Sequence, residues 1–499
     1  MPAADAPRVR TTMGEVRGRV EDGLAVFRGI PYACPPVGPL RLAAPAPAQQ
    51  WEGVREAAAF GPPPPQSALM GAQPGRDGDD DWLTVNVWSP DIGSASLPVL
   101  VWVQGGGYVY GWSGDPTFDG ALLARGGVVV VTFNYRLGAE GFALVAGAPP
   151  NRGLLDQVAA LRWVRDNIAG FGGDAGRVTV VGESAGAGCV AALLAMPSAR
   201  GLFRRAIAQS VPGVLLAEPV AAAVAADMAA RLGTTPSLDE LSRVLPSVLN
   251  QALDATALAG PAHEEWGRAA FAATLVAPVV DGEVLPRTPW EALAAGESSD
   301  VELVVGHNRD EYRLFLVATG LLGAITPGMA DDALRVLAPD AEAYRHAHPG
   351  ADPERLFELV HSDWLFRMPS LHLAEAHCRH APTYLYEISW EAPGMGGGVL
   401  GACHGLGLPL TFGTLSAGSG AFLIGDPVPA EAVELSARVR SAWTSFAGSG
   451  DPGWTPYDPV GRPTWIIDAE PHVAAYPEET SRRLWADDVL APLGLGAVG

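Results

Sequence analysis

The chain has 499 residues, 48% of them hydrophobic, which is enough for a large buried core. Its formal net charge is −22, and all 33 of its cationic side chains are arginines. Such an acidic chain lacks the basic surface that binds phosphates, so nucleic acid is not an expected partner. The longest apolar runs, such as Val128–Phe133, are far shorter than the ~20 residues of a membrane span, so we expect no membrane partner.

Length alone would suggest two or three domains, but neither an internal repeat nor a long linker divides the chain. We therefore expect one domain over residues 1–499. The four cysteines, at positions 34, 189, 378 and 403, lie far apart without the spacing of a zinc site or a disulfide framework. Residues 1–18 show no apolar segment of a secretory signal, so a cytoplasmic protein is expected.

Short strands and turns are predicted up to Trp51, and strands then alternate with helices. The predicted strands are apolar on both faces, which is typical of a mostly parallel sheet covered by helices on both sides. Strands are expected at Leu97–Val103, Val128–Phe133, Arg177–Val181, Val301–Gly306 and Thr383–Trp390. Helices are expected at Leu154–Ile168, Ala185–Ala195, Glu218–Leu232 and Glu434–Phe446, with a short helix after Thr288, a capping box at Ser237 and a mostly helical segment from Tyr312 to His380.

Residues 182–186 read Gly-Glu-Ser-Ala-Gly and are the central chemical signal. An apolar strand runs into this motif and a helix leaves it, which is the geometry of a nucleophile elbow. The motif predicts that Ser184 is a nucleophile. The alternative is a glycine-rich turn between a strand and a helix, without a catalytic serine.

A serine nucleophile needs a base and a third group that orients the base. In proteins with such a serine turn, the order along the chain is serine, acid, histidine, and the acid follows a strand after the serine. Asp310 and Glu311 follow such a strand, and both are candidates from position alone. His404 lies on a glycine-rich loop after a still later strand, and His472 is its only positional rival. The alternative for either carboxylate is a solvated ion pair with a neighbouring arginine.

An oxyanion hole is predicted directly after the strand at Leu97–Val103, where three glycines allow the backbone to approach a substrate closely. The amides of Gly106 and Gly107, with that of Ala185, would form a hole of three donors. Three aromatic residues follow this loop and are expected to line the substrate pocket, unless they pack the core: Tyr108, Tyr110 and Trp112.

Several motifs along nearly the whole chain together resemble those of one family, the type-B carboxylesterases, the group of the cholinesterases and the bacterial p-nitrobenzyl esterases. They are residues 27–33 (Phe-Arg-Gly-Ile-Pro-Tyr-Ala), 83–88 (Leu-Thr-Val-Asn-Val-Trp), 134–138 (Asn-Tyr-Arg-Leu-Gly), 153–157 (Gly-Leu-Leu-Asp-Gln), 171–174 (Phe-Gly-Gly-Asp), 278–282 (Pro-Val-Val-Asp-Gly) and 309–311 (Arg-Asp-Glu). The resemblance implies an α/β-hydrolase fold with helical excursions over the active site.

The resemblance also assigns roles to residues. It places the acid of the triad on Glu311 rather than Asp310, and the histidine on His404. It implies the oxyanion hole of Gly106, Gly107 and Ala185. It further implies that Glu183 acts electrostatically on the imidazolium and that Ser210 contacts the acid.

Some positions depart from the family pattern. Tyr312 replaces the glycine after the acid, and Val211 replaces the glycine after Ser210. Glu140 and Arg152 stand where an apolar or neutral residue is expected. Leu69 and Met70 occupy the loop that carries a cation-binding tryptophan in cholinesterases, so a preference for choline esters is not expected.

We therefore expect a bacterial-type carboxylesterase that cleaves small to medium, neutral esters through an acyl-enzyme, without a metal or a cofactor. A monomer or a small homo-oligomer is expected. One alternative is a biosynthetic enzyme that uses the same site for cyclisation, transacylation or elimination. The other is a non-catalytic binding protein, which the complete set of Ser184, Glu311 and His404 does not favour.

Overall fold

The structure is a computed structural model of the 499-residue chain. It describes residues 6–69, 78–94, 96–260, 263–272, 274–395 and 397–496. Met70, named above, lies outside these residues, whereas Leu69 is exposed at the surface. Within the described segments, no helix is both long enough and apolar enough to cross a membrane.

A mostly parallel sheet of eleven strands forms the centre of the fold, in the order β16-β15-β14-β13-β10-β9-β7-β8-β6-β4-β3. The strands from β8 to β15 are parallel, and the strands at both edges are antiparallel. Their bounds along the sheet are His472–Ala475, Pro463–Ile467, Thr383–Ile388, Glu302–Asn308, Arg205–Gln209, Gly173–Glu183, Leu97–Val103, Val129–Phe133, Thr84–Ser89, Leu24–Pro31 and Arg19–Glu21. Two small sheets are formed by β1 (Arg8–Arg10), β2 (Glu15–Arg17) and β5 (Val54–Glu56), and by β11 (Leu216–Ala217) and β12 (Val279–Val280).

Both faces of the sheet are buried, because alternate residues of the central strands belong to two separate hydrophobic cores. On β7, Val99 and Val101 face the larger core, whereas Leu100 and Trp102 face the other. The larger core is covered by α3 (Arg152–Asn167), α4 (Ala185–Ala195), α8 (Pro289–Ala294) and α13 (Met368–His377). The second core is covered by α1 (Ala121–Ala124), α14 (Gly407–Phe412) and α16 (Ala430–Ser449).

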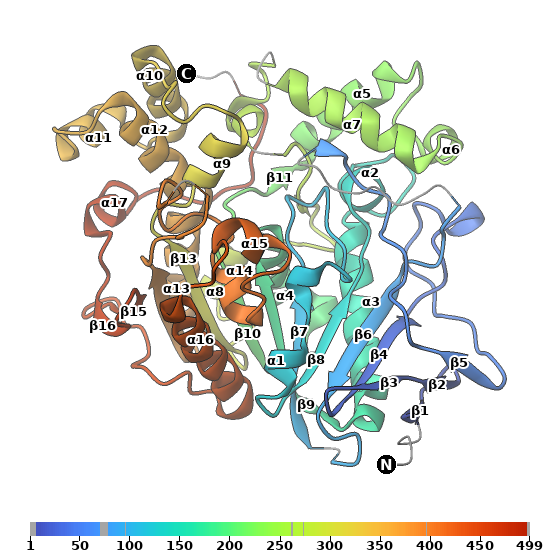
Figure 1. Ribbon diagram of the computed structural model, residues 1–499. Helices are drawn as coiled ribbons and strands as arrows, with labels where there is room; N and C mark the ends of the chain where they lie inside the picture. Colours follow the sequence, from blue (N-terminus) through green and yellow to red (C-terminus); the bar gives the residue numbers. More distant parts are fainter. Residues whose placement is uncertain are drawn as a thin grey trace.

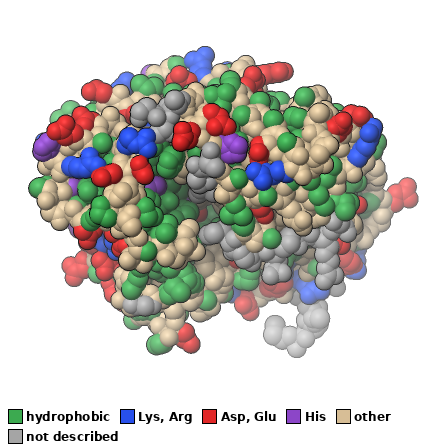
Figure 2. Space-filling view, turned by 90° about the horizontal axis from the view of Figure 1, so that it is seen from above, with side chains coloured by type: hydrophobic (Ala, Val, Ile, Leu, Met, Phe, Trp, Pro, Cys, Tyr) green, Lys and Arg blue, Asp and Glu red, His purple; other side chains and the backbone are tan. Residues whose placement is uncertain are grey.

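Two groups of helices lie above the sheet in Figure 1. One consists of α5 (Glu218–Arg231), α6 (Leu238–Leu241) and α7 (Pro246–Ala259), and the other of α10 (Pro327–Leu337), α11 (Ala341–Ala347) and α12 (Pro353–Ser362). Figure 2 looks down on this end of the molecule and shows hydrophobic side chains around a hollow, with charged side chains of both signs nearby. The remaining helices are α2 (Gly138–Phe142), α9 (Arg313–Ala318), α15 (Ser419–Leu423) and α17 (Glu479–Leu484).

The predicted strands and long helices are confirmed with small shifts at their ends. In the central sheet, strands β6, β15 and β16 were not predicted, nor was the central strand β10. Its five residues, Arg205–Gln209, alternate alanine with other residues and lack the apolar run of the neighbouring strands. The capping box at Ser237 was wrong, because its side chain makes no cap and Glu240 binds Thr234 and Thr235 instead. At α8, by contrast, Thr288 and Glu291 form a complete capping box.

The structure explains the unexpected charges of Glu140 and Arg152. Arg152 is fully buried, and its guanidinium donates to the main-chain oxygens of Glu140, Pro149, Ala139 and Ala143 at 2.7–3.0 Å. The Glu140 carboxylate turns the other way and forms an ion pair with Arg41 at 2.6 Å. Arg152 is the first residue of α3, and its donors satisfy carbonyls around the short helix α2. It thus joins α2 to the start of α3.

Candidate active site

Ser184 lies on a sharp turn between strand β9 and helix α4, as the sequence motif predicted. Its backbone has φ 57° and ψ −128°, a strained conformation for a residue with a side chain. The flanking glycines are required by close approach, because a Cβ on Gly186 would lie 2.1 Å from the carbonyl oxygen of Val103. The Ser184 N–H donates to the carbonyl of Gln209 at 2.9 Å, which ties the turn to β10.

The structure brings His404 to Glu311, and not to Asp310. Glu311 Oε2 lies 2.6 Å from His404 Nδ1, and its Oε1 accepts from the N–H of Asn308 at 2.8 Å. Both carboxylate oxygens are therefore held, and the Glu311 side chain is fully buried. The contact keeps the proton of the imidazole on Nδ1 and leaves Nε2 as the basic nitrogen.

The other nitrogen of His404, Nε2, lies 3.3 Å from Oε1 of Glu183. Among the described residues, no hydrogen bond joins His404 to Ser184 Oγ in this structure; such contacts often form only once substrate is bound. Burial raises the pKa of Glu183 to about 7, although the nearby His404 opposes this shift. Burial also lowers the pKa of His404, but the charges of Glu183 and Glu311 outweigh it and the net shift is upward.

The predicted oxyanion loop has the geometry that only glycine adopts without strain. Gly106 and Gly107 have φ values of +107° and +59°, and a Cβ on Gly106 would lie 2.0 Å from the carbonyl oxygen of Tyr110. The N–H groups of Gly106 and Gly107 donate to no other group within the described part of the chain. The N–H of Ala185 is at the first position of α4, where a helix has no internal acceptor for it.

The three aromatic residues of the expected pocket have different surroundings. Tyr108 is 2% exposed and its ring packs on Phe142, which favours the alternative that it packs the core. Tyr110 is half-buried beside Gly106, and burial together with the charge of Glu183 raises its pKa to about 12. Trp112 donates its indole N–H to the carbonyl of Gly61 and packs against Phe60.

Two further residues singled out in the sequence are Ser210 and His472. Ser210 Oγ makes no hydrogen bond with Glu311 in the described chain, where Asn308 occupies the role expected for it. His472 is exposed on the edge strand β16. In the described chain its side chain contacts the carbonyl of Glu470 and the carboxylate of Asp468, so it does not compete with His404.

Sequence reasoning missed three residues that contact this machinery. Phe366 stacks on the imidazole of His404 with a centroid distance of 4.2 Å, and Phe315 lies 5.3 Å from the same ring. Phe366 belongs to a π-helical turn, Asp363–Arg367, whose position no sequence pattern announces. Thr274 contacts Gly107, since a Cβ on that glycine would lie 2.7 Å from Thr274 Cγ2.

Comparison with known proteins agrees with this architecture. The chain matches the Carboxylesterase family over residues 5–485. It is 36% identical to a para-nitrobenzyl esterase of Bacillus subtilis over 95% of this chain and 97% of that protein, and 36% identical to a phenmedipham hydrolase of Pseudarthrobacter oxydans over 89% and 90%.

Solved structures show the same fold. A PNB esterase superposes with a TM-score of 0.85 at 36% identity, covering 96% of this chain and 99% of that one. A carboxylesterase of Geobacillus stearothermophilus gives a TM-score of 0.84 at 34% identity, again covering 96% and 99%. The chain thus has the α/β-hydrolase fold of an ester-hydrolysing serine hydrolase, and it belongs to the carboxylesterase family of type B.

Proposed function

We propose that Ser184, His404 and Glu311 form the catalytic triad of this carboxylesterase. The observation that carries the proposal is the 2.6 Å contact of the buried Glu311 with His404 Nδ1, on loops next to a strained serine turn. The parallel direction of the strands explains how three loops far apart in sequence reach one end of the sheet. Parallel strands β9, β13 and β14 lie close together in it and precede Ser184, Glu311 and His404, respectively.

In the first step, His404 Nε2 takes the hydroxyl proton of Ser184 as Oγ attacks the ester carbonyl carbon. The carbonyl oxygen becomes an oxyanion, which would accept hydrogen bonds from the amides of Gly106, Gly107 and Ala185. When the tetrahedral intermediate collapses, the C–O bond to the alcohol breaks and the imidazolium returns its proton to the leaving oxygen. An acyl group then remains on Ser184.

In the second step, water replaces the alcohol. His404 Nε2 takes a proton from water as the water oxygen attacks the acyl carbon, and the same amides hold the second oxyanion. Collapse breaks the bond to Ser184 Oγ, which recovers its proton from His404. The products are a carboxylic acid and the free enzyme, so the cycle needs no further reactant.

The surroundings support small to medium, neutral esters as substrates. Thr274 lies against Gly107, and Tyr110 lies against Gly106, so the space beside the proposed oxyanion hole is bounded on two sides. Leu69 is apolar and offers no ring face to a quaternary ammonium group. The relative from Bacillus subtilis is named for an aryl-substituted ester, which supports activated esters as test substrates.

The proposal extends to the domain organisation, the cellular location and the oligomeric state of the enzyme. The eleven-stranded sheet draws strands from residues 19–475, which supports a single domain over the chain. The four cysteines are all unpaired, and this supports a reducing, cytoplasmic environment in a bacterium. We propose that the enzyme acts as a monomer or a small homo-oligomer.

Covalent labelling tests the nucleophile directly. A fluorophosphonate should modify Ser184, as read from the mass of the tryptic or chymotryptic peptide that contains it. Ser184→Ala should abolish labelling and lower kcat for a p-nitrophenyl ester by about 10⁴-fold or more, because the covalent route is lost. Ser242→Ala, at the half-buried C-terminal end of α6, is the matched control and should retain full labelling. An adduct on another serine would refute the assignment.

A further inference from the structure

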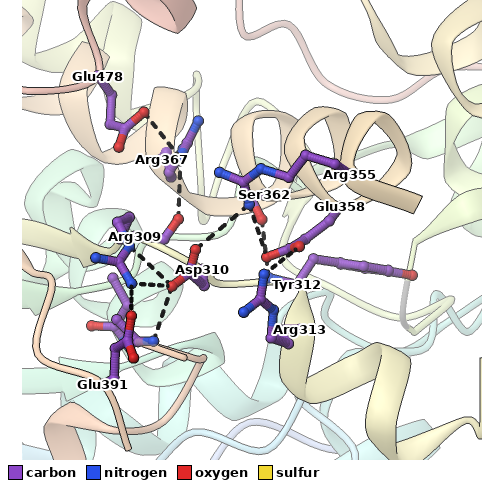
Figure 3. A network of polar contacts seen from close by, with 12 residues as sticks. Arg309, Asp310, Tyr312, Arg313, Arg355, Glu358, Ser362, Arg367, Glu391 and Glu478 are labelled. Atoms are coloured by element: carbon purple, nitrogen blue, oxygen red, sulfur yellow. Dashed lines mark hydrogen bonds and ion pairs between the residues drawn. The ribbon is translucent and has the colours of Figure 1, made fainter. Parts of the chain in front are cut away.

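Asp310, next to the proposed triad acid, is a buried carboxylate with a set of partners of its own. It is 3% exposed, and Figure 3 shows it at the centre of a network of ion pairs and hydrogen bonds. Its side chain makes no contact with His404 in the described chain; its partners are the N–H of Ala402 in the neighbouring loop and two arginines, Arg309 and Arg355. Burial raises its pKa, but the hydrogen bonds and charge of Arg309 outweigh burial and lower it below the usual value.

Asp310 joins the loop that carries Glu311 to the loop that carries His404. Its N–H donates to the carbonyl of Ala402 at 3.0 Å, and its Oδ2 accepts from the N–H of Ala402, also at 3.0 Å. Asn308 adds a third link, since its Nδ2 donates to the carbonyl of Cys403 at 2.6 Å. The two loops are thus paired in register immediately before the two residues that form the 2.6 Å contact.

The arginines connect this pair of loops to the helices around it. Arg309 donates to Asp310 Oδ2 from Nε at 3.0 Å and from Nη2 at 2.8 Å. Arg355 of α12 lies 3.6 Å from Asp310 Oδ1 and 3.2 Å from Glu358, and Glu358 also binds Arg313 of α9 at 2.8 Å. Asp310 is therefore a buried carboxylate that attaches the paired loops to α12, beside the contact of Arg313 with Glu358.

The π-helical turn Asp363–Arg367 supports the same loops from behind. Arg367 is fully buried, donates to the carbonyl of Arg309 at 3.1 Å, and pairs with Asp363 and Glu478. The adjacent Phe366 stacks on the ring of His404. One turn of helix therefore contacts both the loop of the acid and the imidazole.

We propose that Asp310 is a positioning residue for the catalytic imidazole: by pairing with Ala402 and the surrounding arginines, it sets the distance between the acid loop and the histidine loop. The proposal rests on the triad proposed above. A neutral side chain at position 310 would leave Arg309 paired with Glu391 alone and Arg355 paired with Glu358 alone, so the acid loop would lose this ionic contact with α12. A displacement of about 1 Å in such a site can cost on the order of 10²-fold in rate.

Asp310→Asn is the discriminating variant, because it keeps the shape of the side chain and one acceptor for Ala402 while removing the charge. We expect kcat per active site to fall by about 10- to 100-fold, as is typical when a group that orients a catalytic residue is lost. KM for a neutral p-nitrophenyl ester should stay within about twofold, because Asp310 lies outside the substrate space. Active sites are counted by titration with a fluorophosphonate, so that unfolded protein does not enter kcat.

Glu391→Gln is the matched control. Glu391 binds the same guanidinium of Arg309 at 3.0 Å, but its side chain is 62% exposed. Its replacement should leave kcat within about twofold, since exposed ion pairs contribute little.

The hydrogen-bonded proton between Glu311 and His404 gives an NMR signal. This signal would not change if Asp310 only stabilised the fold. In the unmodified protein the proton should give a far-downfield ¹H resonance, and Asp310→Asn should broaden it or shift it upfield. An unchanged resonance together with an unchanged kcat per titrated site would overturn the proposal, whatever the loss of thermal stability. If Glu311→Gln also has no effect, it is the triad assignment that fails; if only Asp310→Asn is silent, the positioning role alone fails.

Discussion

Glu183 and His404 form a buried pair in which each group changes the protonation of the other. They lie 3.3 Å apart, and the charge of Glu183 is the largest of the influences that raise the pKa of His404. His404 must be neutral to act as a base, so kcat/KM should rise with pH along one limb as the imidazolium loses its proton. Because the pKa of His404 is raised, the midpoint of this rise in kcat/KM should lie at a pH above the ordinary pKa of histidine.

Glu183→Gln should move that limb to lower pH, because the neutral amide no longer stabilises the imidazolium. The measurement is the pH profile of kcat/KM for a neutral ester between pH 5 and 9. Asp239→Asn, a charge change at the exposed helix α6, serves as the control and should leave the limb in place. A limb that stays in place in Glu183→Gln would show that Glu183 does not act on His404 in solution.

Glu311→Gln should lower kcat by about 10³- to 10⁴-fold, because an amide at this position can favour the wrong tautomer of the imidazole. The fold should survive, since glutamine still offers an oxygen to the N–H of Asn308. Steady-state kinetics with circular dichroism of the variant would check both statements. Activity close to that of the unmodified enzyme would mean that Glu311 does not orient His404.

At the scale of elements, the contact between α2 and the start of α3 depends on the buried guanidinium of Arg152. Burial and the nearby charge of Arg136 lower the pKa of Arg152 to about 10, against the opposing effect of Glu140 and Asp156. Arg152→Met should reduce the free energy of unfolding by about 3 kcal/mol, because buried carbonyls lose their donors. Arg165→Met, in the same helix but with its side chain 51% exposed, should change it by less than about 0.5 kcal/mol. Urea unfolding of both variants gives the comparison, and equal effects would contradict it.

The start of α8 allows a second test at this scale. Thr288→Ala should cost about 1 kcal/mol, because the capping box with Glu291 is lost from the first turn. Ser237→Ala should cost much less, since the Ser237 side chain makes no cap at α6 although its sequence has the same form. Thermal unfolding of the two variants distinguishes them. A larger loss at Ser237 would mean that the cap forms there after all.

At the scale of the whole molecule, the net charge of −22 creates a field that acts on charged substrates. For a neutral ester, kcat/KM should hardly change between low and high ionic strength. Acetylcholine should gain modestly at low ionic strength, and added salt should abolish the gain, because salt screens interactions beyond about 10 Å. The measurement compares acetylcholine with a neutral ester of similar size at both salt concentrations. A strong preference for acetylcholine that survives high salt would reveal a specific cation site.

Much of the fold could be predicted because the central strands and helices carry strong local signals. Strand β7 and helix α4 were predicted with the bounds that the structure has, since each is a continuous run of apolar and small residues. Strand β10 and the π-helical turn at Asp363–Arg367 were not, because their conformation depends on neighbouring elements more than on their own residues.

The sequence by itself determined the family, the serine turn and the order of the proposed catalytic residues along the chain. It left Asp310 and Glu311 equivalent by position, and only the family resemblance separated them. Tertiary structure decided the outcome physically: it directs Glu311 toward His404 and Asp310 toward Ala402 and Arg309. It likewise turned Tyr108 into the core and paired Glu140 with Arg41, a residue 99 positions away. Such contacts join segments that are distant in sequence, and no local pattern encodes which of two adjacent side chains will face the site.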